Sequence, residues 1–309
     1  MKWLAALAIA IAALIPAASV DSASPPQLLT FTVAHWQPGD RLMQLGGICL
    51  SRASGAGAVR FLPSPVNRDT DFGAAWSRDG KYVAFARWFR PKRLTDVVVA
   101  DARGRVLRNL NLRGGEGTFE TDPSWSPDGH RLAFARSWRG NGVWLINRTG
   151  GGLRELVKDA TEPAWSPDGR TLAFTAFRQP ASNAVHTIGS DGTGRRVVLP
   201  GASDASWSPD GSRLAFISAS SRGTELGLAN ADGTERRVLT ATRDAELSPA
   251  WSPDGKYIAF ARGRERSRIV VMDAASGKEL WVIRRPYGLK TPSWRASATL
   301  PMASRRSCG

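Results

Sequence analysis

Acidic residues recur in this sequence at fixed distances before a repeated tryptophan. Three stand three residues before such a tryptophan, and three stand five residues before it. The first set is Asp122, Glu162 and Asp204, and the second is Asp71, Glu120 and Glu246. Carboxylates that converge can hold a cationic or amine-bearing group, or act together as acid and base. If the fold brings them together, these six residues are the candidate binding residues.

Basic and aromatic residues gather in other segments that follow the same tryptophans. Guanidinium and indole groups suit anionic or aromatic ligands, by charge and by cation–π contact. The candidate rim residues are Arg87, Trp88, Arg90, Arg136, Trp138, Arg139 and Arg264. Repeated loops also carry structural residues, so each acid could instead bond loop N–H groups or pair with a nearby arginine.

Other chemistry finds little support. The three histidines, His35, His130 and His186, do not share an equivalent place in the repeats, which argues against a common metal. We find no phosphate-binding or dinucleotide-binding fingerprint. The sequence therefore predicts no catalytic residues, no metal site and no cofactor, and favours a protein that is not an enzyme.

The tryptophans belong to a phrase, Trp-Ser-Pro-Asp-Gly, that recurs through the chain. Four copies are intact, one reads Trp-Ser-Arg-Asp-Gly, and a sixth is reduced to Trp-Arg. Successive tryptophans lie 40 to 49 residues apart, and they are Trp76, Trp125, Trp165, Trp207, Trp251 and Trp294. Repeats of this length with four short strands each are typical of propeller blades. We interpret the tryptophans as core residues between blades, and the motif aspartates as turn residues.

The two ends of the sequence supply the missing half-repeats. After Trp294 we expect the first two strands of a blade, the second over residues 300–304. Before Trp76 we expect the last two, around residues 48–51 and 59–62. The prediction is an all-β, six-bladed propeller whose closing blade is shared between N- and C-terminal strands. In such blades the loops before the first strand and after the second emerge on one face. The acids would therefore line a tunnel mouth, with the arginines around it.

The recurring phrase resembles the propeller repeat of the TolB family, also called the WD40-like or PD40 repeat. It also recurs in the propellers of prolyl-oligopeptidase-type peptidases. TolB proteins carry an α/β domain before the propeller, for which the residues before position 46 are too few. The peptidases carry a hydrolase domain with a Gly-x-Ser-x-Gly elbow, which is absent from this sequence. The resemblance is a strong indication of the fold and a weak indication of the function.

The first residues predict export. Met1 and Lys2 precede an apolar run that ends in small residues, as in a secretory signal. We predict a signal peptide over residues 1–22, an N-terminal extension over 23–45 and the propeller over 46–309. The mature chain would lie in the periplasm or outside the cell, without a transmembrane segment. The two cysteines, Cys49 and Cys308, are predicted to form a disulfide that holds the closing blade.

The net charge of +15 permits an anionic partner. Arginine outnumbers lysine 35 to 7, however, a bias that a GC-rich genome also produces. The favoured function is a binding or scaffolding module that recognises a protein, peptide or cell-envelope component at the tunnel mouth. One alternative is an enzyme built on the mouth carboxylates. The other is an electrostatic binder of an anionic polymer through the arginine rim.

Overall fold

The computed structural model describes residues 28–35, 44–55, 57–62, 70–89, 94–110, 117–137, 141–178, 182–221, 223–264, 267–285 and 288–295. All regular elements in these ranges are β-strands, and none of the ranges contains a helix that could cross a membrane. The strands are β1 (Leu28–His35), β2 (Gln44–Arg52), β3 (Val59–Arg60), β4 (Thr70–Trp76), β5 (Tyr82–Phe89), β6 (Leu94–Asp101), β7 (Val106–Asn109), β8 (Phe119–Trp125), β9 (Arg131–Ser137), β10 (Gly142–Asn147), β11 (Arg154–Lys158), β12 (Ala160–Trp165), β13 (Thr171–Arg178), β14 (Ser182–Gly189), β15 (Arg196–Pro200), β16 (Ala202–Trp207), β17 (Arg213–Ala219), β18 (Thr224–Asn230), β19 (Arg237–Val238), β20 (Glu246–Trp251), β21 (Tyr257–Arg262), β22 (Arg268–Asp273), β23 (Glu279–Ile283) and β24 (Gly288–Arg295).

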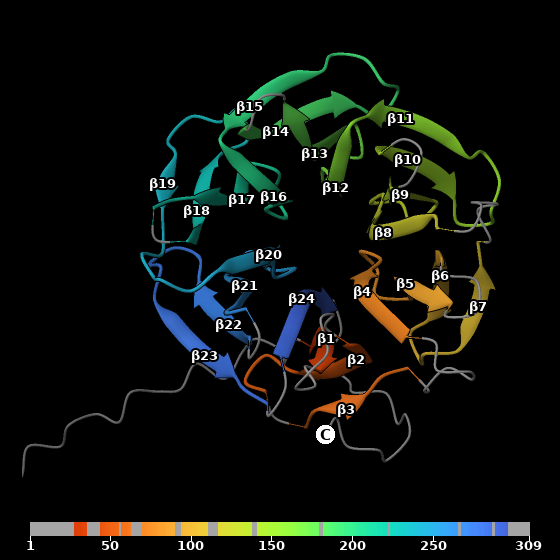
Figure 1. The fold of residues 1–309 in the computed structure, drawn as a ribbon, viewed down its shortest axis with the longest axis horizontal. Coiled ribbons are helices and arrows are strands. Elements are labelled where there is room, and N and C mark those ends of the chain that lie inside the picture. The colour runs from red at the N-terminus through yellow and green to blue at the C-terminus, as the bar shows by residue number, and fades with distance from the viewer. Residues whose placement is uncertain are drawn as a thin grey trace, which may run out of the picture.

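Within these ranges the strands form six four-stranded antiparallel sheets. The sheets surround a central opening like blades, with β4, β8, β12, β16, β20 and β24 innermost (Figure 1). We number blades 1 to 5 from β4–β7 to β20–β23, and call the sheet β24-β1-β2-β3 the closing blade. The predicted six-bladed propeller, with a closing blade that joins N- and C-terminal strands, is confirmed.

The second strand of each blade is buried on both faces because a neighbouring blade covers each side. A phenylalanine stands at its centre in blades 1 to 5 and is at most 1% exposed; these residues are Phe85, Phe134, Phe174, Phe216 and Phe260. Small alanines alternate with them and let the sheets approach closely. Truncation of one such phenylalanine to alanine typically costs about 3–5 kcal/mol.

The Ser-Pro-Asp-Gly phrase folds into a hydrogen-bonded turn between the first and second strands. In blade 1 Ser77 Oγ donates to Asp79 Oδ1 at 2.7 Å, and the same oxygen accepts the Lys81 N–H at 3.1 Å. Gly80 has a φ of +67°, which favours glycine. Blades 2 to 5 repeat the serine–aspartate bond at 2.5–2.6 Å. The motif aspartates are therefore turn residues, as the sequence indicates.

The closing blade differs from the prediction in how the chain ends share it. β1 lies between β24 and β2, so Thr30 pairs with Ser293 and Phe31 with Cys49. Residues 28–35 thus belong to the propeller and not to an N-terminal extension. The reason is apolar content, since Leu28, Leu29 and Phe31 are all fully buried. The expected strand over 300–304 and the leader over 1–22 lie outside the described residues.

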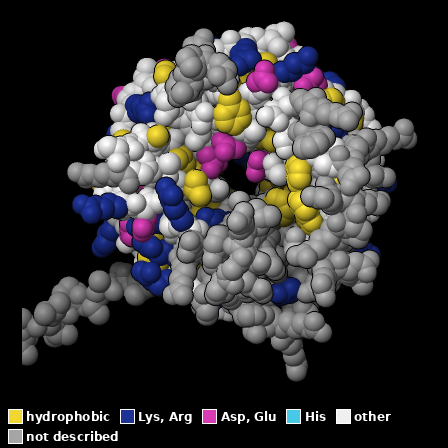
Figure 2. All heavy atoms as spheres, viewed as in Figure 1, with side chains coloured by type: hydrophobic (Ala, Val, Ile, Leu, Met, Phe, Trp, Pro, Cys, Tyr) yellow, Lys and Arg dark blue, Asp and Glu magenta, His cyan; other side chains and the backbone are white. Residues whose placement is uncertain are grey.

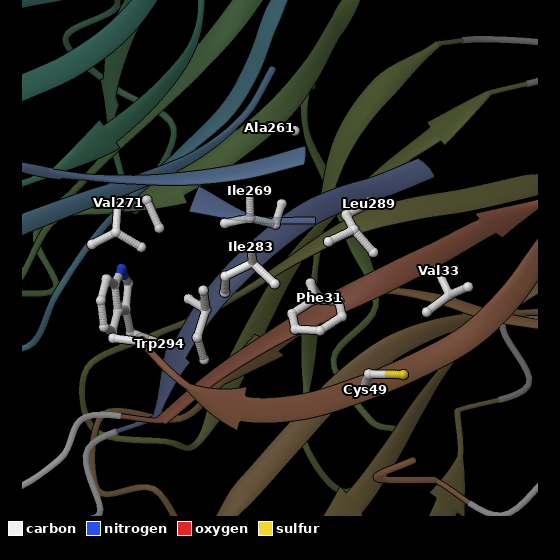
Figure 3. Close-up of a cluster of buried hydrophobic side chains, with 12 residues drawn as sticks. Phe31, Val33, Cys49, Ala261, Ile269, Val271, Ile283, Leu289 and Trp294 are labelled. Atoms are coloured by element: carbon white, nitrogen blue, oxygen red, sulfur yellow. The ribbon is translucent and has the colours of Figure 1, made fainter. Parts of the chain in front are cut away.

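Cys49 sits in β2, 2% exposed, among apolar side chains that join the closing blade to blade 5. Figure 3 shows the Cys49 side chain below Phe31 and Val33 within this cluster. The sequence predicts a strand over residues 300–304 next to β2, but β1 occupies that place. Cys308 lies outside the described residues, so the disulfide stays a prediction.

Candidate functional site: the central channel

The inner strand of each blade carries a bulge three residues before its tryptophan. The paired register shifts there, and the residue at the bulge has a positive φ of 44–63°. These residues are Gly73, Asp122, Glu162, Asp204, Ser248 and Thr291. A left-handed conformation costs a residue other than glycine about 1–2 kcal/mol. Five such residues at equivalent places are therefore held there by the structure around them.

Three of the bulge residues are the acids Asp122, Glu162 and Asp204, which we call the channel acids. They line a cavity of about 320 Å³ at the centre of the ring, together with Ser248 and Thr291. Figure 2 shows acidic side chains at the edge of the central opening. These three residues, which the sequence analysis assigns to the tunnel mouth, thus line one cavity in the structure, and their role in binding stays a prediction.

Hydrogen bonds connect the bulges of successive blades. Glu162 Oε2 accepts the Asp204 N–H at 2.8 Å and the Thr175 hydroxyl at 2.7 Å. Asp204 Oδ2 in turn accepts the Ser248 N–H at 2.6 Å. Asp122 accepts from the hydroxyl of its neighbour Thr121 at 2.9 Å. These bonds fix the carboxylates in place, but none of the donors carries a charge.

Burial raises the pKa of all three channel acids. Mutual repulsion adds to it, because Asp122 raises the pKa of Glu162 and both raise that of Asp204, which lies well above its usual range. Among the described residues, no lysine or arginine forms an ion pair with any of them. The channel therefore holds three carboxyl groups without a counter-cation, and a bound cation would stabilise their ionised form.

The other three predicted acids, Asp71, Glu120 and Glu246, do not line this cavity in the described structure, which corrects the sequence expectation. They are at most 1% exposed, and each pairs with an arginine directly opposite on the second strand. We call them the paired acids. The N···O distances are 2.6 Å for Asp71–Arg87, 3.1 Å for Glu120–Arg136 and 2.8 Å for Glu246–Arg262.

The pairing also changes the interpretation of the rim. Arg87 and Arg136 are engaged with paired acids, and Arg136 also stacks on Trp144 at 4.6 Å. Trp88 stacks on Phe119 at 5.3 Å. Arg264 is exposed. Residues Arg90, Trp138 and Arg139 lie outside the described residues, so the rim they would form stays a prediction.

The repeated tryptophans join the inner strands of neighbouring blades. Trp125, Trp207 and Trp294 each donate an indole N–H to a backbone carbonyl of the preceding blade, at 2.9–3.2 Å. Trp76 instead donates to the Thr30 hydroxyl at 3.2 Å, and Trp165 is 7% exposed. Trp251 is half-buried. These contacts give the tryptophans a structural role.

The histidines stay apart. His130 is exposed in a turn, and His186 is buried against Phe174 with ring centroids 5.5 Å apart. The side chain of His35 is outside the described residues. Within the described ranges, no group of three or more histidine, cysteine or carboxylate side chains has the geometry to hold a metal ion.

The sequence does contain a pattern that marks the acids paired with arginine, but the pattern is recognised only once the strand register is known. Each paired acid precedes its arginine by 16 residues. Blades 3 and 4 carry alanine at the acid position, and the facing residues there are Ala176 and Ser218. Acid and arginine therefore appear together or are both absent. The channel acids have no such partner, which separates the two sets.

The fold and the channel define a six-bladed β-propeller with a carboxylate-lined centre. The model of the PD40 family, described as the TolB beta propeller domain, matches residues 67–298, and the chain belongs to this family.

Several solved structures share the fold. TolB from Acinetobacter baumannii is 19% identical, with a TM-score of 0.71 over 87% of this chain and 66% of that one. A protein assigned as TolB from Agrobacterium tumefaciens is 18% identical, with a TM-score of 0.63 over 85% and 90%. A chain of a Nidogen/Laminin complex is 17% identical, with a TM-score of 0.65 over 89% and 100%. This chain thus spans just under two thirds of the Acinetobacter protein, and at these identities the likeness concerns the fold.

Proposed function

We propose that this propeller is an exported, non-catalytic binding module that recognises a protein, a peptide or a cell-envelope component at the acidic end of its channel. The single observation that carries the proposal is the set of channel acids, three carboxylates that face one cavity without a cationic partner among the described residues. A cavity of about 320 Å³ is large enough to admit a lysine or arginine side chain or an amino terminus.

Burial of a carboxyl group without a cationic partner costs stability, and such a group is retained where a ligand supplies the missing cation. A cationic group in the channel would ionise the three acids and gain charge-assisted hydrogen bonds from them. Membership in the TolB propeller family, and the presence of a similar propeller in a complex of two proteins, support a protein or peptide as the partner.

The test is a pull-down from the native cell envelope with the wild type and the triple variant D122N/E162Q/D204N. The matched control is D191N/D232N/D273N, which removes three carboxylates from exposed outer turns, where the asparagine side-chain oxygen can still accept the backbone N–H of the turn. We expect the channel variant to lose partners that the control retains. Recovery of the same partners by both variants would exclude the channel as the recognition site.

The raised pKa values of Glu162 and Asp204 favour one alternative, an enzyme that uses a protonated carboxyl as general acid. Turnover of glycoside, ester or peptide substrates by the wild type, and its loss in D204N, would support that alternative. The other alternative, a protein that binds an anionic polymer through the arginine rim, has less support. Arg87 and Arg136 form ion pairs with paired acids and are not available to such a polymer.

The Cys49–Cys308 disulfide belongs to the same proposal, since it requires an oxidising compartment. Its loop of 259 residues would contribute up to about 5 kcal/mol by loop-closure entropy. Among the described residues no cysteine is free. Intact-mass measurement of exported protein after alkylation without reduction should show no modified thiol, and two modified thiols would exclude the bridge.

A further inference from the structure

A second cavity, of about 350 Å³, lies at the opposite end of the channel from the acids. The inner strands begin near the acids and end at the tryptophans, so the two cavities occupy the two ends of one channel. The second cavity is lined mainly by indole and proline rings; it contacts Trp76, Trp125, Trp165, Trp207, Trp294, Pro127, Pro167, Pro209 and Pro253. Three turn serines, Ser77, Ser166 and Ser208, and one charged side chain, Arg78, complete the lining.

Arg78 stands at the position where the four intact copies of the phrase carry proline. In those turns the proline packs on the turn glycine of the next blade. A Cβ on Gly169 would meet Pro127 Cγ at 3.0 Å, and one on Gly211 would meet Pro167 Cγ at 3.5 Å. The same construction on Gly129, next to Arg78, meets nothing within 4 Å. The arginine therefore leaves the position that proline occupies elsewhere, and open space remains there.

The guanidinium extends across the end of the channel instead. Its Nη1 donates to the carbonyl oxygen of Pro167 at 2.9 Å, which links blade 1 to blade 3 past the blade between them. Arg78 forms no ion pair with any described residue, and the adjacent Asp79 is engaged with Lys81 at 3.2 Å. A guanidinium has five N–H donors, so several remain available at a cavity walled by aromatic rings.

A second guanidinium lies close to the same wall. Arg295 is 7% exposed and stacks over the Trp76 ring at 4.7 Å. Its Nε and Nη1 atoms have no hydrogen-bond partner among the described residues. Buried cations are normally paired. Two arginines without carboxylate partners beside one tryptophan indicate that this end of the channel attracts an anion.

We propose that this second cavity binds a carboxylate attached to an apolar body. Arg78 would bind the carboxylate through its free donors, and the indole and proline rings would cover the apolar part. A volume of about 350 Å³ lies at the small end of known ligand sites, and suits a small organic acid or the last residue or two of a polypeptide. A bare phosphate fits less well, since the rings offer nothing to replace its hydration.

The chain supplies its own control variant. R78P restores the residue found in the four other turns, so the turn and the fold should be retained while the guanidinium is removed. R78Q is the second variant, which removes the charge and keeps most of the side-chain length. Far-UV circular dichroism and thermal unfolding check both proteins.

The probe is 3-phenylpropionate, compared by calorimetry with 3-phenylpropan-1-ol, which has the same body without the charge. We expect the wild type to bind the acid at least tenfold more tightly than the alcohol, and R78P and R78Q to lose that preference. D204N, at the other end of the channel, should bind the acid like the wild type. Equal binding of acid and alcohol, or unchanged binding by folded R78P and R78Q, would overturn the proposal.

A second pair of probes distinguishes the source of the carboxylate. Acetyl-glycyl-phenylalanine with a free carboxylate should bind, and its C-terminal amide should not. Tighter binding of this peptide than of 3-phenylpropionate would identify a polypeptide C-terminus as the ligand, and equal binding would identify a small acid. Displacement of 3-phenylpropionate by millimolar inorganic phosphate would contradict the assignment to carboxylates.

Discussion

The paired acids and the channel acids all lie on inner strands, at positions only two residues apart in the repeat, yet their surroundings are opposite. Glu246 is fully buried and bonded to Arg262, whereas Asp204 faces the channel without a cation. The position of the paired acids lies opposite the second strand of the blade. The position of the channel acids falls on a bulge that turns the residue toward the channel. Position relative to the bulge, and not residue type, thus decides whether an acid is structural or available.

The largest effect should come from breaking a buried pair. R262A leaves Glu246 without its cation in a site that is 0% exposed, and we expect a loss of about 3–5 kcal/mol in the free energy of unfolding. Urea denaturation measures it. The control is R268A, whose pair with Asp244 at 2.8 Å is partly exposed and should cost about 1 kcal/mol or less. Equal losses in the two variants would contradict the distinction.

At the channel we expect the opposite effect, in which removal of a carboxylate increases the free energy of unfolding. Because burial raises the pKa of Asp204, the folded protein keeps a proton that the unfolded chain releases. Stability present below the ordinary pKa of 3.8 is therefore lost as the pH rises. D204N removes this loss and still accepts the Ser248 N–H, so we expect a gain of roughly 0.5–2 kcal/mol at pH 7.

Thermal unfolding between pH 5 and 8 measures this gain, which should grow with pH. D210N is the matched comparison, because hydrogen bonds from Ser208 lower the pKa of Asp210 and its loss should destabilise the turn. A destabilised D204N would place Asp204 among the structural acids.

Glu120 gives a smaller, pH-dependent effect within the paired set. Burial raises its pKa from 4.5 to about 7, although Arg136 opposes the shift. Its contribution to stability is thus complete below about pH 4.5 and is lost as the pH rises through 7. In E120Q we expect a flatter dependence of unfolding free energy on pH between 5 and 8. D191N, a control that removes a surface carboxylate whose pKa is lowered by hydrogen bonds from Thr193, should keep the wild-type slope between pH 5 and 8. An unchanged slope in E120Q would refute the assignment.

The smallest effect is expected for Arg264, which is exposed and forms no ion pair with the described residues. R264A should change the unfolding free energy by no more than about 0.5 kcal/mol. R87A, from the same predicted rim, should cost several times as much because Arg87 binds Asp71 through two hydrogen bonds. Similar costs for the two variants would show that the rim arginines form one class.

The fold could be predicted because one phrase, with its turn residues and its tryptophan, recurs at a constant period. The closing blade could not be predicted as well, since β1 lacks the phrase and carries only an apolar pattern that many strands share. The channel acids were predictable as a set from their spacing. Their separation from the paired acids depends on the bulge, and a positive φ at Asp122 or Glu162 has no signature in residue type. Arg78 stood out as a departure from the repeat, but its reach to Pro167 depends on the ring.

The position of β1 has a consequence for how the ring is made. A strand from near the beginning of the chain is held between β2 and the last described strand, and Thr30 pairs with Ser293 across 263 positions of sequence. Blades 1 to 5 can each form from local hairpins, but β1 keeps one unpaired edge until β24 arrives. During synthesis the open edge persists until almost the whole propeller has been made, and such an edge is a template for wrong pairing. We therefore expect the pairing of β1 with β24, which closes the propeller, to be the slow step of folding and the step most exposed to misfolding.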